Sequence, residues 1–278
     1  MQISVLDYPI ELVETNPSGE QLIVLLHGFG ASTFSWRTVI GDLKTFGHVV
    51  AYDRPGFGLT PSVERGSNPD RYSLAGQVDL LEAVIQKYAV GRPVVVIGHS
   101  AGALVAAEHA LRHPESVDAL VLESPAIWRR RPMPRLVERA LRSSAFETLG
   151  DRILASFAKA GMKILTDSFH DKSKLTQEVI DGYTAPMARD DWRLALWRFM
   201  TADQSNQVRG NLWRFDLPVL VISGDDDQIV KVEDTFKVAE RIPGHSIYLV
   251  PNCGHLAHEE DPADFLRVTT RFIAKLPV

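Results

Sequence analysis

Short apolar runs alternate with amphipathic segments along most of the chain. The runs cover residues 21–28, 48–56, 93–100, 118–126, 218–226 and 245–252. Most of them are continuously apolar, which is typical of strands that are covered on both faces. They predict a mostly parallel sheet, to which residues 2–14 add an antiparallel leading strand.

Helices are predicted between these runs. One begins near Ser32 and continues to Phe46 with a single apolar stripe. A second begins at Ser73, a good N-cap residue, and a last one covers residues 262–274 with Pro262 in its first turn. Strands that alternate with helices in this way predict a parallel sheet with helices on both faces.

The alternation stops after about residue 127 and resumes at Pro218. Residues 128–212 contain no convincing strand pattern and are expected to form several helices. We therefore expect one α/β core, made of residues 1–127 and 213–278, and a helical cap of residues 128–212 inserted into it.

Composition and charge limit the classes of protein to which the chain can belong. A net charge of −5 argues against nucleic-acid binding, which usually requires a basic surplus. The single cysteine, Cys253, excludes an intramolecular disulfide and suits a reducing compartment. The N-terminus has no signal-peptide pattern, and no apolar run approaches the roughly 20 residues that a membrane span needs. These observations predict a cytoplasmic protein without stable membrane insertion.

The segment "VVVIGHSAGAL" places Ser100 between two glycines where a strand turns into a helix. Such a turn can expose a nucleophile above the carboxyl edge of the sheet, and its tightness requires very small residues at positions 98 and 102. The amide of Ala101, at the start of the helix, is then available to stabilise an oxyanion.

A serine nucleophile needs a base, and the base needs an orienting carboxylate. His255 follows the last strand and is favoured, because Gly254 frees its loop; His258 is the nearest rival. For the acid, the loop after residues 218–224 offers Asp227, and Glu123 at the end of another strand is the second candidate.

The segment "LLHGFGAS" ends at the same sheet edge and supplies the remaining oxyanion donor. We expect this donor to be the backbone N–H of Phe29, opposite Ala101. A dinucleotide site is a weak alternative for Gly28 and Gly30, because the third glycine and the acidic residue of that motif are missing.

The chain resembles α/β-hydrolase-fold enzymes with a helical cap. The matching segments are "HGFG", "DRPGFG", "GHSAG", "GDDDQIV" and "NCGH", in the family's order. The resemblance implies that Ser100 is the nucleophile, Asp227 the acid and His255 the base, with the amides of Phe29 and Ala101 as the oxyanion hole. It implies a structural role for Asp53 in the "DRPGFG" loop.

Departures from related families refine this resemblance. Haloalkane dehalogenases and epoxide hydrolases carry a carboxylate in place of Ser100, and the epoxide enzymes use lid tyrosines, of which this lid offers only Tyr183. Carbon–carbon bond hydrolases often carry a tryptophan after the catalytic histidine, where this chain has Leu256. Cofactor-free haloperoxidase-like members share the triad.

We therefore expect a serine hydrolase that cleaves a small apolar ester without a metal or organic cofactor. The alternatives are a carbon–carbon bond hydrolase, a haloperoxidase-like enzyme and a ligand-binding receptor with little turnover. The apolar lid residues are expected mainly to pack within the lid and against the core, with one or two over Ser100. They are Trp128, Trp192, Trp197, Phe199 and Met200.

A second feature of the lid is a stripe of arginines, Arg131, Arg135, Arg139 and Arg142, at helical spacing. We expect it to form a solvated face, with contact to an anionic membrane surface or substrate as the alternative.

Overall fold

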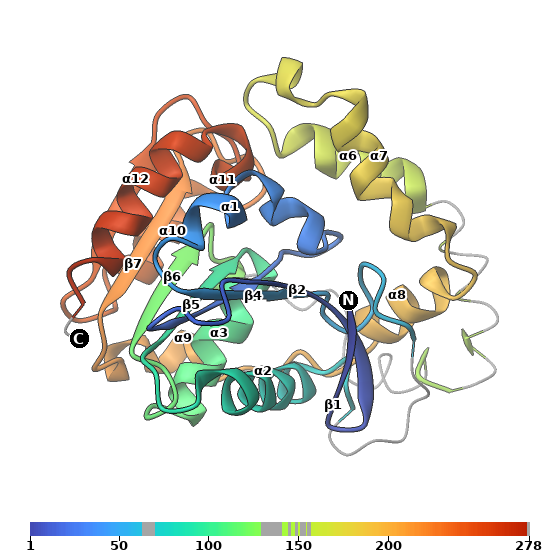
Figure 1. Cartoon of the computed structure of the whole chain (residues 1–278). Coiled ribbons are helices and arrows are strands. Elements are labelled where there is room, and N and C mark those ends of the chain that lie inside the picture. Colours follow the sequence, from blue (N-terminus) through green and yellow to red (C-terminus); the bar gives the residue numbers. More distant parts are fainter. Residues whose placement is uncertain are drawn as a thin grey trace.

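An eight-stranded sheet organises the protein (Figure 1). The computed structural model describes residues 1–62, 70–128, 141–143, 146–147, 150, 154 and 157–276. The strands are β1 (Gln2–Val5), β2 (Tyr8–Thr15), β3 (Leu22–Leu26), β4 (His48–Tyr52), β5 (Val94–His99), β6 (Ala119–Glu123), β7 (Val219–Gly224) and β8 (Ser246–Val250).

The strands lie in the order β1-β2-β4-β3-β5-β6-β7-β8. The hairpin of β1 and β2 pairs antiparallel with β4, and the strands from β4 to β8 are parallel. All six predicted parallel runs are strands, and the predicted leading strand is a two-stranded hairpin. The carboxyl ends of the six parallel strands therefore meet at one edge of the sheet.

Helices cover both faces of the sheet, as predicted (Figure 1). Leu22, Val24 and Leu26 of β3 point into a core with α2 (Leu74–Ala89), α3 (Ala101–Arg112) and α10 (Val232–Ala239). Ile23 and Leu25 point to the other face, against η1 (Thr33–Thr38), α1 (Ile40–Leu43) and α12 (Pro262–Ile273). Because both faces are buried, β3 must be continuously apolar, and this produced its sequence signal.

Two predicted helix starts are confirmed by their caps. The Ser73 hydroxyl accepts a hydrogen bond from the Gly76 N–H at 3.0 Å, and Pro262 lies in the first turn of α12. The helix predicted from Ser32 to Phe46 is divided into η1 and α1, because the backbone leaves helical geometry at Val39 (φ −123°). His258 lies on a separate short helix, α11 (Ala257–Glu260), which precedes α12.

Between β6 and β7 the described residues form helices without a strand, in agreement with the expected helical insertion. In Figure 1, α6 and α7 extend beyond the core, and α8 returns toward it. The helical elements here are η2 (Ala126–Trp128), α6 (Phe157–Asp167), η3 (Lys172–Lys174), α7 (Gln177–Thr184), η4 (Ala185–Ala188), α8 (Trp192–Met200), α9 (Val208–Asn211) and η5 (Leu212–Arg214). The limits proposed for the cap, residues 128 and 212, remain a prediction.

Candidate active site

Ser100 lies in a strained turn between β5 and α3. Its backbone has φ 53° and ψ −112°, in a region that residues with a side chain rarely adopt. A Cβ atom at Gly98 would lie 2.7 Å from the Ala103 backbone, and one at Gly102 would lie 2.2 Å from the Leu26 carbonyl oxygen. The two glycines therefore allow the turn to form against the neighbouring strand, as the sequence predicted.

His255 and Asp227 form a buried pair at the same edge of the sheet. The Nδ1–H of His255 donates to Asp227 Oδ2 at 2.7 Å, and each residue is 5% exposed. The loop of His255 is fixed to the residue before the nucleophile, because His99 Nε2–H donates to the His255 carbonyl oxygen at 3.0 Å. The structure thus brings the predicted acid and base together beside the Ser100 turn.

The Nε2 atom of His255 is the ring nitrogen left for Ser100. In the described part of the chain, no hydrogen bond joins this atom to Ser100 Oγ. Catalytic hydrogen bonds are often long in an enzyme without its substrate and shorten when the substrate binds. The arrangement therefore permits a serine–histidine–aspartate triad, in which His255 Nε2 must move within hydrogen-bond distance of Ser100 Oγ to take its proton.

Asp227 remains ionised in this buried position. Burial acts to raise the pKa of its carboxyl, but the charge and hydrogen bond of His255 act against it. The N–H groups of Ile229 and Val230 also donate to Oδ1, at 2.8 and 2.9 Å. Together these interactions hold the pKa of Asp227 below its ordinary value. Of the three consecutive aspartates 225–227, only Asp227 is buried.

The two rival residues, His258 and Glu123, are paired with each other. His258 Nδ1–H donates to Glu123 Oε2 at 2.7 Å, and both side chains are fully buried. The backbone N–H of His258 also donates to Glu123, and the Trp36 ring stacks on the imidazole at a centroid distance of 4.3 Å. The pair connects α11 to the end of β6. Because it is inaccessible, it is a structural contact beneath the His255 loop.

The loop that carries Phe29 lies against the nucleophile turn. A Cβ atom at Gly28 would lie 3.3 Å from the Ser100 Cβ and 2.7 Å from His99 Nδ1. Ala101 is the first residue of α3, so its amide belongs to the free N-terminal turn of that helix. Both predicted oxyanion donors therefore belong to segments that flank Ser100.

Asp53 fixes the "DRPGFG" loop, as its expected structural role requires. Its carboxylate accepts hydrogen bonds from the N–H groups of Thr33 and Leu59, both at 2.7 Å. A Cβ atom at Gly58, where φ is +55°, would collide with this carboxylate at 1.9 Å. Asp53 thus joins the "DRPGFG" loop to the start of η1, next to the Phe29 loop.

Two apolar clusters include residues next to the candidate site. The Phe29 ring contacts Phe57 and Phe199 at centroid distances of 5.5 and 5.8 Å. In the second cluster, Leu256, the residue after His255, packs with Phe169 and Val179 of the inserted segment. The inserted helices therefore contribute apolar surface beside both the predicted oxyanion loop and the predicted base.

The other lid residues lie as expected for packing. Trp197 is buried in the same cluster as Phe199, with Trp192 partly buried against it, while Met200 is partly exposed. Trp128 packs against the core instead of the site. Three members of the arginine stripe, Arg131, Arg135 and Arg139, lie outside the described residues, and the Arg142 Nε donates to the Thr201 carbonyl oxygen at 2.6 Å.

The inserted segment is also attached directly to the base loop. The N–H of His255 donates to the Ser168 carbonyl oxygen at 2.7 Å. The buried Glu260 carboxylate accepts from the N–H of Gly254 at 2.7 Å and from the N–H of His170 at 3.0 Å. The base loop and residues 168–170 of the insertion are therefore one hydrogen-bonded unit.

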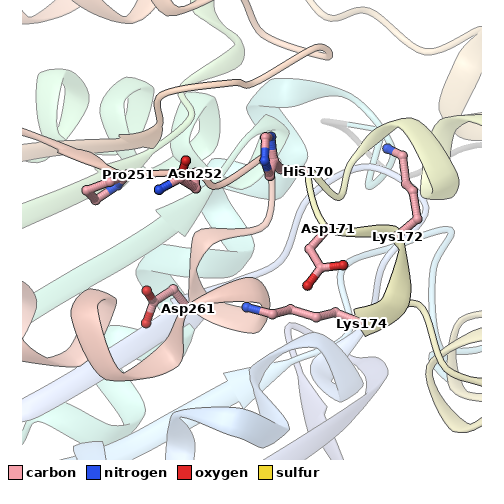
Figure 2. A pocket seen from close by; sticks show the side chains of 7 residues that line it. All are labelled: His170, Asp171, Lys172, Lys174, Pro251, Asn252 and Asp261. Atoms are coloured by element: carbon pink, nitrogen blue, oxygen red, sulfur yellow. The ribbon is translucent and has the colours of Figure 1, made fainter.

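A charged depression of about 590 Å³ is lined by His170 of this unit and by neighbouring residues (Figure 2). Residues from the insertion and from the end of β8 line it. In Figure 2, the Lys174 side chain points toward Asp261, and its ammonium donates to the Glu260 carbonyl oxygen. The lining residues are His170, Asp171, Lys172, Lys174, Pro251, Asn252 and Asp261. Ser100 is not among them, so this depression is separate from the candidate site.

Two histidines outside the candidate triad are each paired with a carboxylate from a distant part of the sequence. His109 Nε2 contacts Glu82 at 2.8 Å, and His170 Nδ1 contacts Asp226 at 2.7 Å. The hydrogen bond with Asp226 raises the pKa of His170, whereas burial lowers the pKa of His109 to about 4. No pattern in the sequence marks these partners, because each pair joins different elements.

Membrane insertion was not expected, and none of the helices in the described ranges has the length and apolar character needed to span a bilayer.

Known proteins match the chain over most of its length. The sequence profile described as "Alpha/beta hydrolase family" matches residues 23–268. The chain is 29% identical to the "Uncharacterized hydrolase YugF" of Bacillus subtilis, over 91% of this chain and 92% of that protein. It is 28% identical to the "2-hydroxy-6-oxo-6-(2'-aminophenyl)hexa-2,4-dienoic acid hydrolase" of Metapseudomonas resinovorans, with coverages of 92% and 84%. It is 26% identical to the "Monoacylglycerol lipase abhd6-A" of Xenopus laevis, with coverages of 94% and 77%.

Proposed function

The chain belongs to the alpha/beta hydrolase family and is a hydrolase, and on this premise we propose that it cleaves carboxylic esters through an acyl-enzyme on Ser100. The observation that carries the proposal is the buried 2.7 Å contact between His255 and Asp227, next to the strained turn of Ser100. A strained serine beside an oriented imidazole is the arrangement that nucleophilic acyl transfer requires.

The proposed reaction has two similar halves. Ser100 Oγ attacks the ester carbonyl carbon while His255 Nε2 takes its proton, and the same proton then passes to the departing alcohol. Asp227 orients the ring and stabilises the imidazolium. The amides of Phe29 and Ala101 bind the oxyanion of the tetrahedral intermediate. Water then attacks the acyl-enzyme with His255 as base, which regenerates Ser100 and releases the acid.

An apolar substrate fits the surroundings of this site. Phe57 and Phe199 adjoin Phe29 of the predicted oxyanion loop, and Leu256, next to the predicted base, packs with Phe169 in a separate cluster. An ester places an acyl group and an alcohol group on opposite sides of the reacting carbon, so each apolar cluster can take one of them. The relative named as a monoacylglycerol lipase supports an ester with an apolar chain.

A second candidate is a carbon–carbon bond hydrolase that acts on hydroxy-oxo-dienoic acids. The relative named for such a dienoic acid favours it. Leu256, where carbon–carbon bond hydrolases often carry a tryptophan, weighs against it. The ester proposal is therefore preferred.

Hydrolysis of p-nitrophenyl esters from acetyl to dodecanoyl tests the proposal. We expect a maximum at one acyl length and complete loss in Ser100→Ala. Ser124→Ala is the matched control, because Ser124 is a buried serine with positive φ (44°) at the end of the neighbouring strand, and should retain activity. Absence of ester turnover in folded protein, together with cleavage of a 2-hydroxy-6-oxo-dienoate, would instead establish the second candidate.

A further inference from the structure

Arg54 is a buried cation close to the predicted oxyanion loop, and the proposed reaction does not yet use it. Its side chain is among the largest that are fully buried, at 1% exposure. One amino group donates to Gln77 Oε1 at 2.6 Å, and the other donates to the Gly28 carbonyl oxygen at 3.1 Å. No carboxylate in the described part of the chain lies within ion-pair distance of it. A guanidinium without a counterion in such a position needs an explanation.

The Gly28 carbonyl oxygen receives a second hydrogen bond from His27. The backbone N–H of Arg54 donates to His27 Nε2 at 3.0 Å, so Nε2 is the unprotonated nitrogen. Nδ1 therefore carries the proton and donates it to the Gly28 carbonyl oxygen at 2.8 Å. Burial and the charge of Arg54 lower the pKa of His27 well below its ordinary value, which keeps this neutral tautomer in place.

Both hydrogen bonds act on the peptide unit that includes the Phe29 N–H. A trans peptide is planar, with its N–H opposite its C=O, so fixing the Gly28 oxygen also fixes the direction of the Phe29 N–H. A cation at the oxygen withdraws electron density from the peptide, and hydrogen bonds in such a chain strengthen one another. This peptide adjoins Ser100, since a Cβ atom at Gly28 would lie 3.3 Å from the Ser100 Cβ.

We propose that Arg54 is a positioning residue for the oxyanion hole: its guanidinium orients and polarises the Gly28–Phe29 peptide, whose N–H then binds the oxyanion on Ser100 more strongly. The inference rests on the proposed function, because it assumes that Ser100 forms an oxyanionic intermediate. It assigns a role in the reaction to a side chain that does not touch the substrate.

The charge of Arg54 makes this effect selective for the transition state. Burial lowers the pKa of Arg54 to about 10, so the guanidinium remains charged at neutral pH. A buried positive charge without a counterion interacts most favourably when negative charge develops nearby, as it does in the tetrahedral intermediate. The ground-state ester carries no such charge. Loss of Arg54 should therefore lower kcat and leave KM nearly unchanged.

A purely structural role is the alternative, because Arg54 also joins the "DRPGFG" loop to α2 through Gln77. Arg189 provides a matched control. It donates to the Gly58 carbonyl oxygen at 2.8 Å and to the Thr60 carbonyl oxygen at 2.5 Å, and so holds the same loop without contacting Gly28. If Arg54 only stabilised the loop, Arg54→Met and Arg189→Met would affect catalysis in the same way.

The test compares Arg54→Met, Arg54→Lys and Arg189→Met with the wild type. For each we would measure kcat and KM on the preferred p-nitrophenyl ester, the Tm, and the rate at which a fluorophosphonate labels Ser100. In labelling, Ser100 Oγ bonds to phosphorus and fluoride departs, while the phosphoryl oxygen occupies the oxyanion hole. Removal of a complete oxyanion donor typically costs 10²–10³ in kcat, so weakening one should lower kcat and labelling by about 10- to 100-fold.

We expect this loss in Arg54→Met with KM unchanged, a smaller loss in Arg54→Lys, which keeps the cation, and none beyond its Tm effect in Arg189→Met. Equal losses in Arg54→Met and Arg189→Met, or a rise in KM alone, would overturn the proposal. If Arg54→Met does not fold, the same comparison is made with Arg54→Lys. If the wild type hydrolyses no ester, the ester proposal fails, and the labelling rates alone decide the role of Arg54. A wild type that is not labelled at Ser100 overturns both.

Discussion

Replacement of Asp227 by asparagine tests the predicted acid with almost no change in shape. The carboxylate has a distinct partner at each oxygen. Oδ2 accepts from the His255 ring at 2.7 Å, and Oδ1 accepts from the N–H groups of Ile229 and Val230 at 2.8 and 2.9 Å. An asparagine at this position can place its amide group in only two orientations.

The two backbone donors decide between these orientations. If the NH₂ group of Asn occupied the Oδ1 position, it would face two N–H groups, and both hydrogen bonds would be lost, at about 1 kcal/mol each plus the desolvation of unpaired donors. The carbonyl oxygen therefore takes this position, and the NH₂ group faces His255 Nδ1. Nδ1 must then accept a hydrogen bond, and the ring proton moves to Nε2. A ring protonated at Nε2 cannot take the proton of Ser100.

We therefore expect Asp227→Asn to lower kcat by about 10⁴, the loss found when this tautomer is imposed on a serine-hydrolase triad, with little change in KM or fold. The assay is steady-state hydrolysis of the preferred p-nitrophenyl ester, with the Tm as a check on folding. Asp226→Asn is the matched control, because Asp226 is adjacent, its side chain is 46% exposed, and its carboxylate accepts hydrogen bonds from His170 and Gln228. We expect it to keep the wild-type kcat.

The result that would refute this reasoning is retention of kcat within about tenfold in Asp227→Asn. Equal losses in Asp226→Asn and Asp227→Asn would also refute it, because the effect would then come from the charge of the loop. A large loss in Glu123→Gln with none in Asp227→Asn would transfer the role of the acid to the rival pair.

Three further outcomes are expected. Gly102→Ala should lower the free energy of unfolding by about 1–3 kcal/mol or prevent folding, because its Cβ would lie 2.2 Å from a backbone oxygen. Gly41→Ala is the control and should be tolerated, because no atom lies near a Cβ at this position of α1. Thermal unfolding of the two variants compares them. Glu123→Gln should destabilise by about 1–3 kcal/mol in urea unfolding, since a buried partner of His258 is lost, and should leave the labelling rate of Ser100 unchanged. His170→Gln should lower the Tm most between the ordinary carboxyl pKa of about 4 and the ordinary imidazole pKa of about 6.5, where Asp226 is ionised and His170 is protonated. The pKa of His170 is raised in the fold, so the stabilisation from its pair with ionised Asp226 is complete below the unfolded pKa near 6.5 and is lost as the pH rises through the folded value; an equal Tm difference at every pH would contradict it.

The sheet could be predicted from the sequence because a strand buried on both faces carries few polar residues. The runs at residues 21–28 and 93–100 correspond to β3 and β5, which are buried along their whole lengths. The glycines around Ser100 were equally informative, since the space at Gly98 and Gly102 is closed by backbone atoms. Such signals are local, and the sequence records them directly.

Contacts between distant elements could not be predicted in this way. Glu123 and His258 are 135 positions apart, and only the fold shows that these rivals pair with each other. Arg54 was visible in the sequence only as part of a family motif, and its contact with Gly28 depends on how two loops meet. The division of the first helix at Val39 likewise depends on how η1 packs on the core. The apolar stripe continues through this position, so the sequence pattern does not indicate the break.

The attachment of Ser168 and His170 to the base loop constrains how this enzyme can be re-engineered. A common strategy for changing substrate range exchanges the entire insertion between two members of a fold family. Here such a chimera would change the backbone path of the segment whose Ser168 carbonyl oxygen accepts from the His255 amide and whose His170 amide donates to Glu260. A successful graft must therefore retain residues 168–171 of the host and replace only the helices on either side of them.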